Sequence, residues 1–85
     1  MNAILLKTDK TEVEIKPEKG KRFTMEEMQK FVGGYFQYIH LPGGKFLVVN
    51  EDGGPLNLPV NEKASEIFGA KIVGNCLLAS KALIS

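Results

Sequence analysis

The chain has 85 residues, of which 44% are hydrophobic and 25% charged, and its formal net charge is +1. This length allows one domain, and the balance of residue types excludes a disordered or collagen-like chain. The near-neutral charge provides no strong signal for nucleic-acid binding. A core this small buries only about 60–65% of the unfolded surface, so we expect a homo-oligomer, which adds buried area.

A single cysteine, Cys76, excludes an internal disulfide and a multi-cysteine zinc site. Its neighbours Leu77 and Leu78 are apolar, which predicts a buried and unreactive thiol. No stretch approaches the roughly 18–20 apolar residues that a membrane span needs. We therefore expect a cytoplasmic protein with no membrane contact.

Two short segments at the start of the chain predict a hairpin of strands. Ala3–Leu6 is an apolar run, and residues 11–16 alternate between apolar and charged side chains after a turn. Val13 and Ile15 fall on one face of the second strand, whereas Glu12 and Glu14 fall on the other. The glutamates are interpreted as solvent-facing charges, in preference to a catalytic pair.

The clearest local signal is a capping box. Thr24 is followed three residues later by Glu27, which predicts a helix over Met25–Val32. Gly33 then ends the helix, because glycine enters the left-handed region at little cost, and Gly34 frees the next turn. The alternative for this glycine pair is close approach of a ligand phosphate to backbone N–H groups. A helix stop is the preferred interpretation.

A second hairpin is predicted from residues 35–41 and Lys45–Asn50, which are rich in strand formers and flank Pro42-Gly43-Gly44. We expect it to be central to the sheet. Tyr38 and His40 share a face and could stack on a planar ligand, although an ordinary, partly exposed strand is favoured.

Residues 50–55 combine acids with turn formers. Read as a calcium-binding EF-hand loop, they would put the first and twelfth ligand positions on Val48 and Pro59, which cannot serve. The segment predicts a sharp turn and no metal site.

Asn61 is predicted to cap a helix over Glu62–Phe68, which ends at Gly69. A buried strand over residues 72–80 and a tail over residues 81–85 follow. The order β-β-α-β-β-α-β predicts a single α+β domain over residues 1–85, with a mixed or mainly antiparallel sheet and both helices on one face.

No catalytic residue, metal ligand or cofactor is assigned. Cys76 and His40 would have to meet across the sheet to form a nucleophile pair, and residues 43–45 lack the rest of a phosphate-binding loop. Backbone donors and stacking side chains indicate a ligand-binding surface instead. The candidate ligand-binding residues are Gly33, Gly34, Tyr35, Tyr38, His40, Asn50, Glu51, Asp52 and Asn61.

Four segments, FVGGY (31–35), VNEDG (49–53), LPVN (58–61) and IVGN (72–75), occur in this order and together resemble a family of small phage- and plasmid-borne domains. The family is domain of unknown function number three-eight-four-six, and the similarity covers residues 13–78. The resemblance implies a short accessory protein in a bacterial or phage cytoplasmic setting. It supplies no catalytic residues.

The main functional hypothesis is a non-enzymatic accessory binding protein of a phage or mobile element, which captures a nucleotide-like signal or blocks a host defence protein. One alternative is a structural or protein-interaction module with no small ligand. A less favoured alternative is a small hydrolase that uses Glu51, Asp52 and His40.

Overall fold

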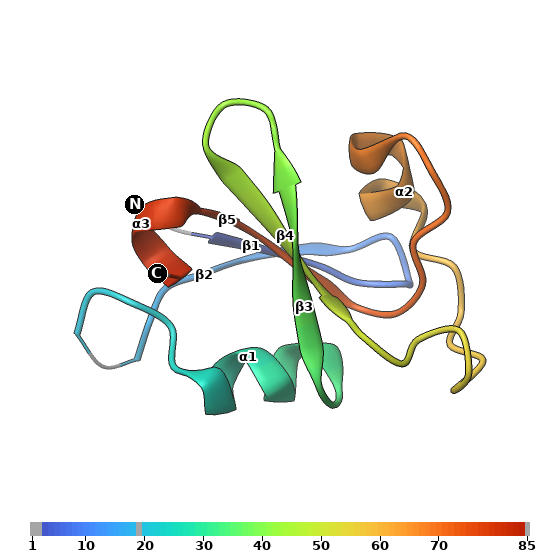
Figure 1. Ribbon diagram of the computed structural model, residues 1–85, viewed down its shortest axis with the longest axis horizontal. Helices are drawn as coiled ribbons and strands as arrows, with labels where there is room; N and C mark the ends of the chain where they lie inside the picture. The colour runs from blue at the N-terminus through green and yellow to red at the C-terminus, as the bar shows by residue number, and fades with distance from the viewer. Residues whose placement is uncertain (1–2, 19, 85) are drawn as a thin grey trace.

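One antiparallel sheet organises the protein, as the computed structural model in Figure 1 shows for residues 3–18 and 20–84. Within these residues the sheet has five strands in the order β2-β1-β5-β4-β3, and every neighbouring pair is antiparallel. The elements in chain order are β1 (Ala3–Leu6), β2 (Glu12–Ile15), α1 (Met25–Val32), β3 (Phe36–Leu41), β4 (Lys45–Asn50), α2 (Glu62–Phe68), β5 (Cys76–Ser80) and α3 (Lys81–Ile84).

The predicted α+β class and the order of the first seven elements are confirmed. The prediction that the second hairpin is central is wrong, because β3 is an edge strand. The central strand is β5, which pairs with β1 on one side and with β4 on the other. The last strand of the chain therefore joins the two hairpins and leaves β2 and β3 at the two edges.

Both faces of the sheet are covered, and by different helices. Along β4, Phe46 and Val48 belong to a core cluster that includes α1 and α3, whereas Leu47 and Val49 belong to a second cluster that includes Ala64 of α2. The expectation that the two main helices share a face is therefore wrong. The physical reason is that β4 and β5 are apolar on both faces, so each face needs a cover.

The ends of α1 form as the sequence predicts. The Thr24 side chain accepts a hydrogen bond from the Glu27 N–H (3.1 Å), and the Glu27 carboxylate accepts one from the Thr24 N–H (2.9 Å). Gly33 closes the helix in the left-handed region, with φ 82°. Capping therefore determines where β3 can begin.

The carboxyl end of the chain is a short helix rather than the predicted tail. Leu83 and Ile84 of α3 are buried, and the Phe23 N–H donates to the Leu83 carbonyl at 2.7 Å. Apolar burial and this backbone bond order the segment, while Ser85 lies outside the described residues.

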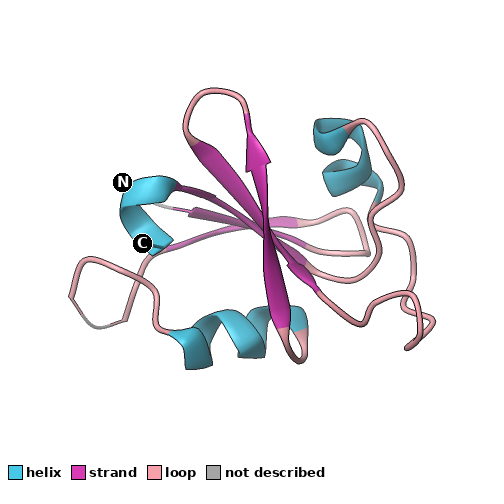
Figure 2. Cartoon of the chain, in the orientation of Figure 1, coloured by secondary structure: helices cyan, strands magenta, loops and turns pink. Residues whose placement is uncertain are grey.

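The last strand is shorter than predicted, because β5 begins only at Cys76. Gly74 has φ 80°, which interrupts an extended run, and ahead of it Val73 forms an isolated bridge with Val60. Figure 2 shows the long loop from the end of β4 to α2 that this bridge ties down. None of the helices in the described parts of the chain is long and apolar enough to cross a membrane.

Candidate functional site

The nine candidate residues do not form one site. Gly33, Gly34 and Tyr35 lie beside the 50–52 turn, since the Glu51 N–H donates to the Tyr35 carbonyl at 2.9 Å. Tyr38 and His40 lie further along β3, and Asn61 lies at the start of α2, on the other face of the sheet.

The glycine pair is used to end a helix. The N–H groups of Gly33 and Gly34 both donate to the Gln29 carbonyl, at 2.8 and 2.9 Å. These are the donors that a ligand phosphate would have needed, so the helix-stop interpretation explains them fully.

Asn50 is buried and holds α1 against the turn that follows β4. Its Nδ2 donates to the Val32 carbonyl at 2.9 Å, and its Oδ1 accepts from the Asp52 N–H at 2.7 Å. Both ends of the amide are occupied by protein partners. Asn50 therefore has a structural role at this corner.

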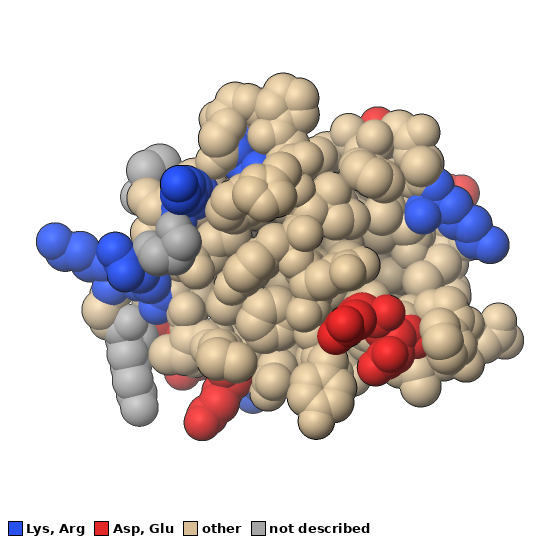
Figure 3. All heavy atoms as spheres, in the orientation of Figure 1, with Lys and Arg blue, Asp and Glu red and all other residues tan. Residues whose placement is uncertain are grey.

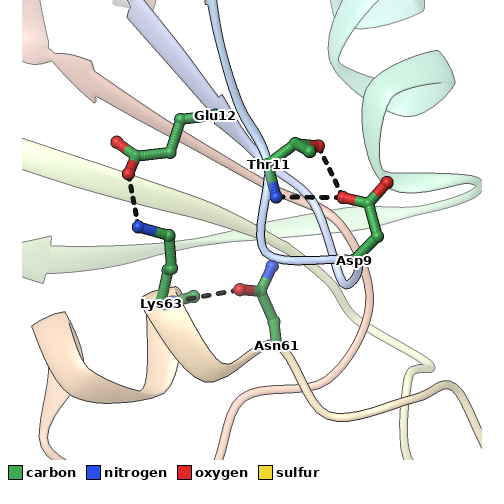
Figure 4. Close-up of polar contacts among 6 residues, drawn as sticks. Asp9, Thr11, Glu12, Asn61 and Lys63 are labelled. Atoms are coloured by element: carbon green, nitrogen blue, oxygen red, sulfur yellow. Dashed lines mark hydrogen bonds and ion pairs between the residues drawn. The ribbon is translucent and has the colours of Figure 1, made fainter.

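Asn61 is completely buried, and its side-chain amide makes three hydrogen bonds. Its Nδ2 donates to the carbonyls of Leu6 (2.8 Å) and Gly74 (2.9 Å), and its Oδ1 accepts from the Ala64 N–H (3.1 Å). Figure 4 shows the amide at the start of α2, beside the turn between β1 and β2. Asn61 joins α2 to β1 and to the loop before β5.

Glu51 and Asp52 are exposed in the turn, and His40 is exposed near the other end of β3. Five residues of strand separate His40 from Tyr35, the neighbour of Glu51, which corresponds to about 16 Å. No group of three or more His, Cys, Asp or Glu side chains positioned to hold a metal ion occurs among the described residues. The three proposed hydrolase residues are not brought together.

Cys76 is buried, as predicted, and its Sγ donates to the Gly74 carbonyl at 3.3 Å. Burial raises the pKa of the thiol to about 12, which keeps it protonated. The thiol faces the α2 side of the sheet, whereas the His40 ring contacts Phe46 on the α1 side. A Cys–His nucleophile pair is therefore not formed.

A row of aromatic side chains follows β3 on the α1 side of the sheet. The Tyr38 ring lies 5.5 Å from Phe36 and 5.8 Å from Phe46, and the His40 ring lies 4.4 Å from Phe46, all measured between ring centroids. Phe46 is buried and packs against both Tyr38 and His40, so it holds their rings in place. The Tyr38 ring is itself partly open to solvent.

The backbone of the same residues is directed away from the sheet. The Tyr35 carbonyl points toward β4, because it accepts from Glu51. In an antiparallel ladder this direction alternates, so the N–H and C=O groups of Phe36, Tyr38 and His40 point to the open edge. Hydrogen-bonding groups and aromatic rings of the same three residues thus line one edge.

No charged residue occurs in β3. β3 crosses in front of the other strands in Figure 1, and in the same orientation the centre of Figure 3 is free of Lys, Arg, Asp and Glu. A hollow of about 200 Å³ adjoins the edge on the α2 side, between Gln37 and Ile39 of β3 and Lys71 to Val73. We call the surface formed by Phe36, Tyr38, His40 and their outward backbone groups the β3 edge.

The opposite edge of the sheet is different. The Lys7 N–H donates to the Thr11 carbonyl at 3.0 Å, so by the same alternation the outward backbone groups of β2 belong to Glu12 and Glu14. Glu12 accepts from the Lys63 ammonium at 2.6 Å, and Lys10 pairs with Glu62 at 3.0 Å. α2 is thereby tied to the β2 edge (Figure 4).

The turn before β2 is held by its own side-chain hydrogen bonds. The Asp9 carboxylate accepts from both the N–H and the hydroxyl of Thr11. These hydrogen bonds, the one from the hydroxyl above all, lower the pKa of Asp9. The β1–β2 turn is thus closed by local contacts.

Sequence reasoning found Tyr38 and His40 but missed the β3 edge as a whole. It predicted that the second hairpin lies in the middle of the sheet, where no backbone group would be free. It placed Phe36 on the same face as Tyr38 and His40, but Phe36 and Phe46 were not among its candidate residues. The composition of residues 36–41 gave no signal for it, because a strand without charge or proline is typical of the middle of a sheet.

The fold and this edge define a small α+β domain with one charged and one uncharged sheet edge. The sequence profile of the family described as "Domain of unknown function (DUF3846)" matches residues 1–82, and the chain belongs to this family. No curated protein and no solved structure matches the chain.

Proposed function

We propose that this protein is a non-enzymatic binding module that contacts another polypeptide by adding a strand to the β3 edge. The observation that supports this most directly is the coincidence of three outward-facing backbone positions with three aromatic side chains, Phe36, Tyr38 and His40. Main-chain bonds supply affinity in strand addition, and side chains at alternate positions supply specificity.

The lack of protection at this edge favours binding. Edge strands usually carry charges, proline or a bulge, because an open edge pairs with other chains. β3 is six residues long and has none of these features among its residues, and it pairs with β4 without interruption from Phe36 to Leu41. An edge left open in this way suits a binding strand.

A small ligand has less support than a polypeptide. Nucleotide capture would draw on the glycine N–H groups and on the amides of Asn50 and Asn61, but these already bond to Gln29, Val32, Leu6 and other protein groups. A surface hollow of about 690 Å³ lies against the start of α1, beside Met25 and Phe31, and is lined by none of the nine candidate residues.

The proposed setting is the cytoplasm of a bacterium that carries a phage or other mobile element, where the protein serves as an accessory factor. The resemblance of the four ordered segments to phage- and plasmid-borne domains motivates this setting. Within it, a binding module of this size can act by occupying a surface of another protein.

A photo-crosslinking amino acid placed at Tyr38 tests the proposal in cells that produce the protein. Val13 is the matched control position, because it is exposed to a similar degree (38% against 41% for Tyr38) but lies on the charged β2 strand. We expect defined protein adducts from position 38 and none from position 13. Equal labelling at both positions, or no adduct at position 38, would contradict the proposal.

A further inference from the structure

The identity of the added strand can be inferred from the β3 edge itself. We propose that β3 pairs with β3 of a second copy of this chain, antiparallel and about a two-fold axis that brings Tyr38 opposite Tyr38. This inference rests on the proposed function and names the partner of the same surface. The result is one continuous sheet across two copies.

The two-fold arrangement follows from the backbone geometry. An axis perpendicular to the sheet reverses the strand direction and keeps each face on its own side, so the α1 faces of both copies lie together. Facing residues must then be outward-facing on both strands. Tyr38 faces Tyr38, and Phe36 faces His40 of the second copy, with two main-chain hydrogen bonds in each pair.

The register is specified by the ends of the strand. A shift of two residues in one direction would put Pro42, which has no N–H, opposite Phe36. A shift in the other direction would put Gly34, which has no side chain, opposite His40. Only the register centred on Tyr38 uses the backbone and the rings of all three outward residues.

Side chains agree with this register on both faces. On the α1 side the aromatic rows of the two copies join, with Tyr38 next to its symmetry mate and Phe36 next to His40 of the second copy. On the α2 side Ile39 of one copy lies opposite Gln37 of the other, at the border of the 200 Å³ hollow. No charged side chain of β3 has to be desolvated.

The flanking charges are complementary as well. Lys45 is paired with Leu41 at one end of β3, whereas Glu51 is bonded to Tyr35 at the other end. The two-fold axis brings Leu41 opposite Tyr35 of the second copy, which places Lys45 and Glu51 of different copies on the same face, about 14 Å apart between Cα atoms. At this separation the charges are largely screened, so they do not oppose the pairing and contribute little to it.

The β2 edge cannot serve in the same way. A two-fold pairing of β2 would put Glu12, which already pairs with Lys63, opposite Glu14 of the second copy, so that two carboxylates would lie side by side. Pairing through β2 is therefore opposed by charge repulsion, whereas pairing through β3 brings no like charges together. We accordingly expect β3 to be the strand that self-associates.

Disulfide trapping of the purified full chain tests the inference. In the proposed register two Tyr38→Cys residues lie within the Cα separation that a disulfide spans, about 5.5 Å. Cys76 does not compete, because it is buried with a raised pKa. We expect mild oxidation to convert Tyr38→Cys to a species of twice the 9.4 kDa chain mass, while the matched Val13→Cys control stays at one chain mass.

Sedimentation equilibrium of the unmodified chain provides an independent measurement that no cysteine can bias. We expect a monomer–dimer equilibrium, with the dissociation constant raised at least about a hundredfold by Tyr38→Lys, because two ammonium groups then meet at the axis. The circular dichroism spectrum of the variant should match that of the unmodified chain, since Tyr38 is 41% exposed.

Two outcomes would overturn the inference: a chain that stays monomeric up to millimolar concentration, or trapping that is equally fast at positions 13 and 38. Either result would leave the proposed function to be tested by photo-crosslinking in cells. There, an adduct of twice the chain mass indicates a second copy, whereas an adduct of any other mass indicates a different protein. Loss of all adducts at position 38 would remove the proposed function and the inference together.

Discussion

Both edges of the sheet direct backbone N–H and C=O groups outward, but the side chains beside these groups differ between the two edges. At β2 the outward backbone groups belong to Glu12 and Glu14, the strand has four residues, and two ion pairs tie α2 alongside. At β3 they belong to Phe36, Tyr38 and His40, the strand has six residues, and no charge is present.

Exposure alone therefore does not decide whether an edge is open to partners. Glutamates at outward positions keep water at the β2 edge and repel a second strand of the same kind. Aromatic residues at outward positions leave the β3 edge with hydrogen-bonding groups and apolar surface that a partner can cover. Single substitutions at the contacts that hold this sheet and its edges test the difference.

The largest effect is expected at the tie between α2 and the β2 side of the sheet. Asn61→Ala removes three hydrogen bonds and leaves the Leu6 carbonyl, the Gly74 carbonyl and the Ala64 N–H without this partner in a buried place. We expect a loss of about 2–4 kcal/mol in the free energy of unfolding, measured by urea titration.

Glu66→Ala is the control for this change, because it removes an exposed side chain of the same helix α2. It should change the free energy of unfolding by less than about 0.5 kcal/mol. Similar losses for Asn61→Ala and Glu66→Ala would show that the hydrogen bonds of Asn61 do not hold α2 to the sheet.

A smaller effect is expected at the entry to the central strand. Gly74 has φ +80°, and a Cβ there would lie 2.8 Å from Leu58 Cδ1, so Gly74→Ala meets both backbone strain and a close side-chain contact. We expect a loss of about 1–3 kcal/mol, measured by the same titration.

The matched substitution is Gly54→Ala, because its Cβ would meet nothing within 4 Å. Gly54→Ala should be close to neutral, within about 0.5 kcal/mol. If Gly74→Ala were equally neutral, the proposed interruption of the last strand by this glycine would be wrong.

The smallest effect is expected for the charge pair at the β2 edge. The hydrogen bond and charge of Glu12 raise the pKa of Lys63 above its ordinary value. Because the folded pKa is above the unfolded one, this stabilisation is fully present below the unfolded pKa and is lost as the pH rises through the folded pKa.

Glu12→Gln should therefore lower the melting temperature slightly at neutral pH, and the difference from the unmodified chain should vanish in strong alkali and shrink in high salt. Melting curves across this pH range measure it. A difference that stays constant through the alkaline range would contradict the assigned cause of the raised pKa.

Local features of the fold could be predicted from the sequence because each depends on a few neighbouring residues. The capping box of Thr24 and Glu27, the Asn61 cap and the glycine stops at Gly33 and Gly69 are all confirmed. Capping depends on hydrogen bonds within one helical turn, so residue types at fixed spacing predict it.

The strand order could not be predicted in the same way. β5 pairs with β1, whose residues are about seventy positions earlier in the chain, and nothing in the local pattern of either strand specifies that contact. The consecutive apolar residues at positions 76–79 put apolar side chains on both faces, which is the one indication in the sequence of β5 that it is a central strand. They do not identify its neighbours.

The candidate site was misread for a related reason. The uncharged, aromatic composition of β3 is typical of a central strand, so the hairpin was predicted to lie there. Asn50 and Asn61 were predicted as ligand contacts because polar side chains at turns resemble binding residues, yet both are buried among backbone partners. Residue type alone does not distinguish these roles.

Hydrogen exchange of backbone amides tests the contrast between the edges most directly. In dilute protein the amides of Phe36, Tyr38 and His40 should exchange quickly, as should that of Glu12, because all four face outward. With rising protein concentration the three β3 amides should become protected and the Glu12 amide should not. Exchange at β3 that is unaffected by concentration, or protection that rises equally at both edges, would contradict the account.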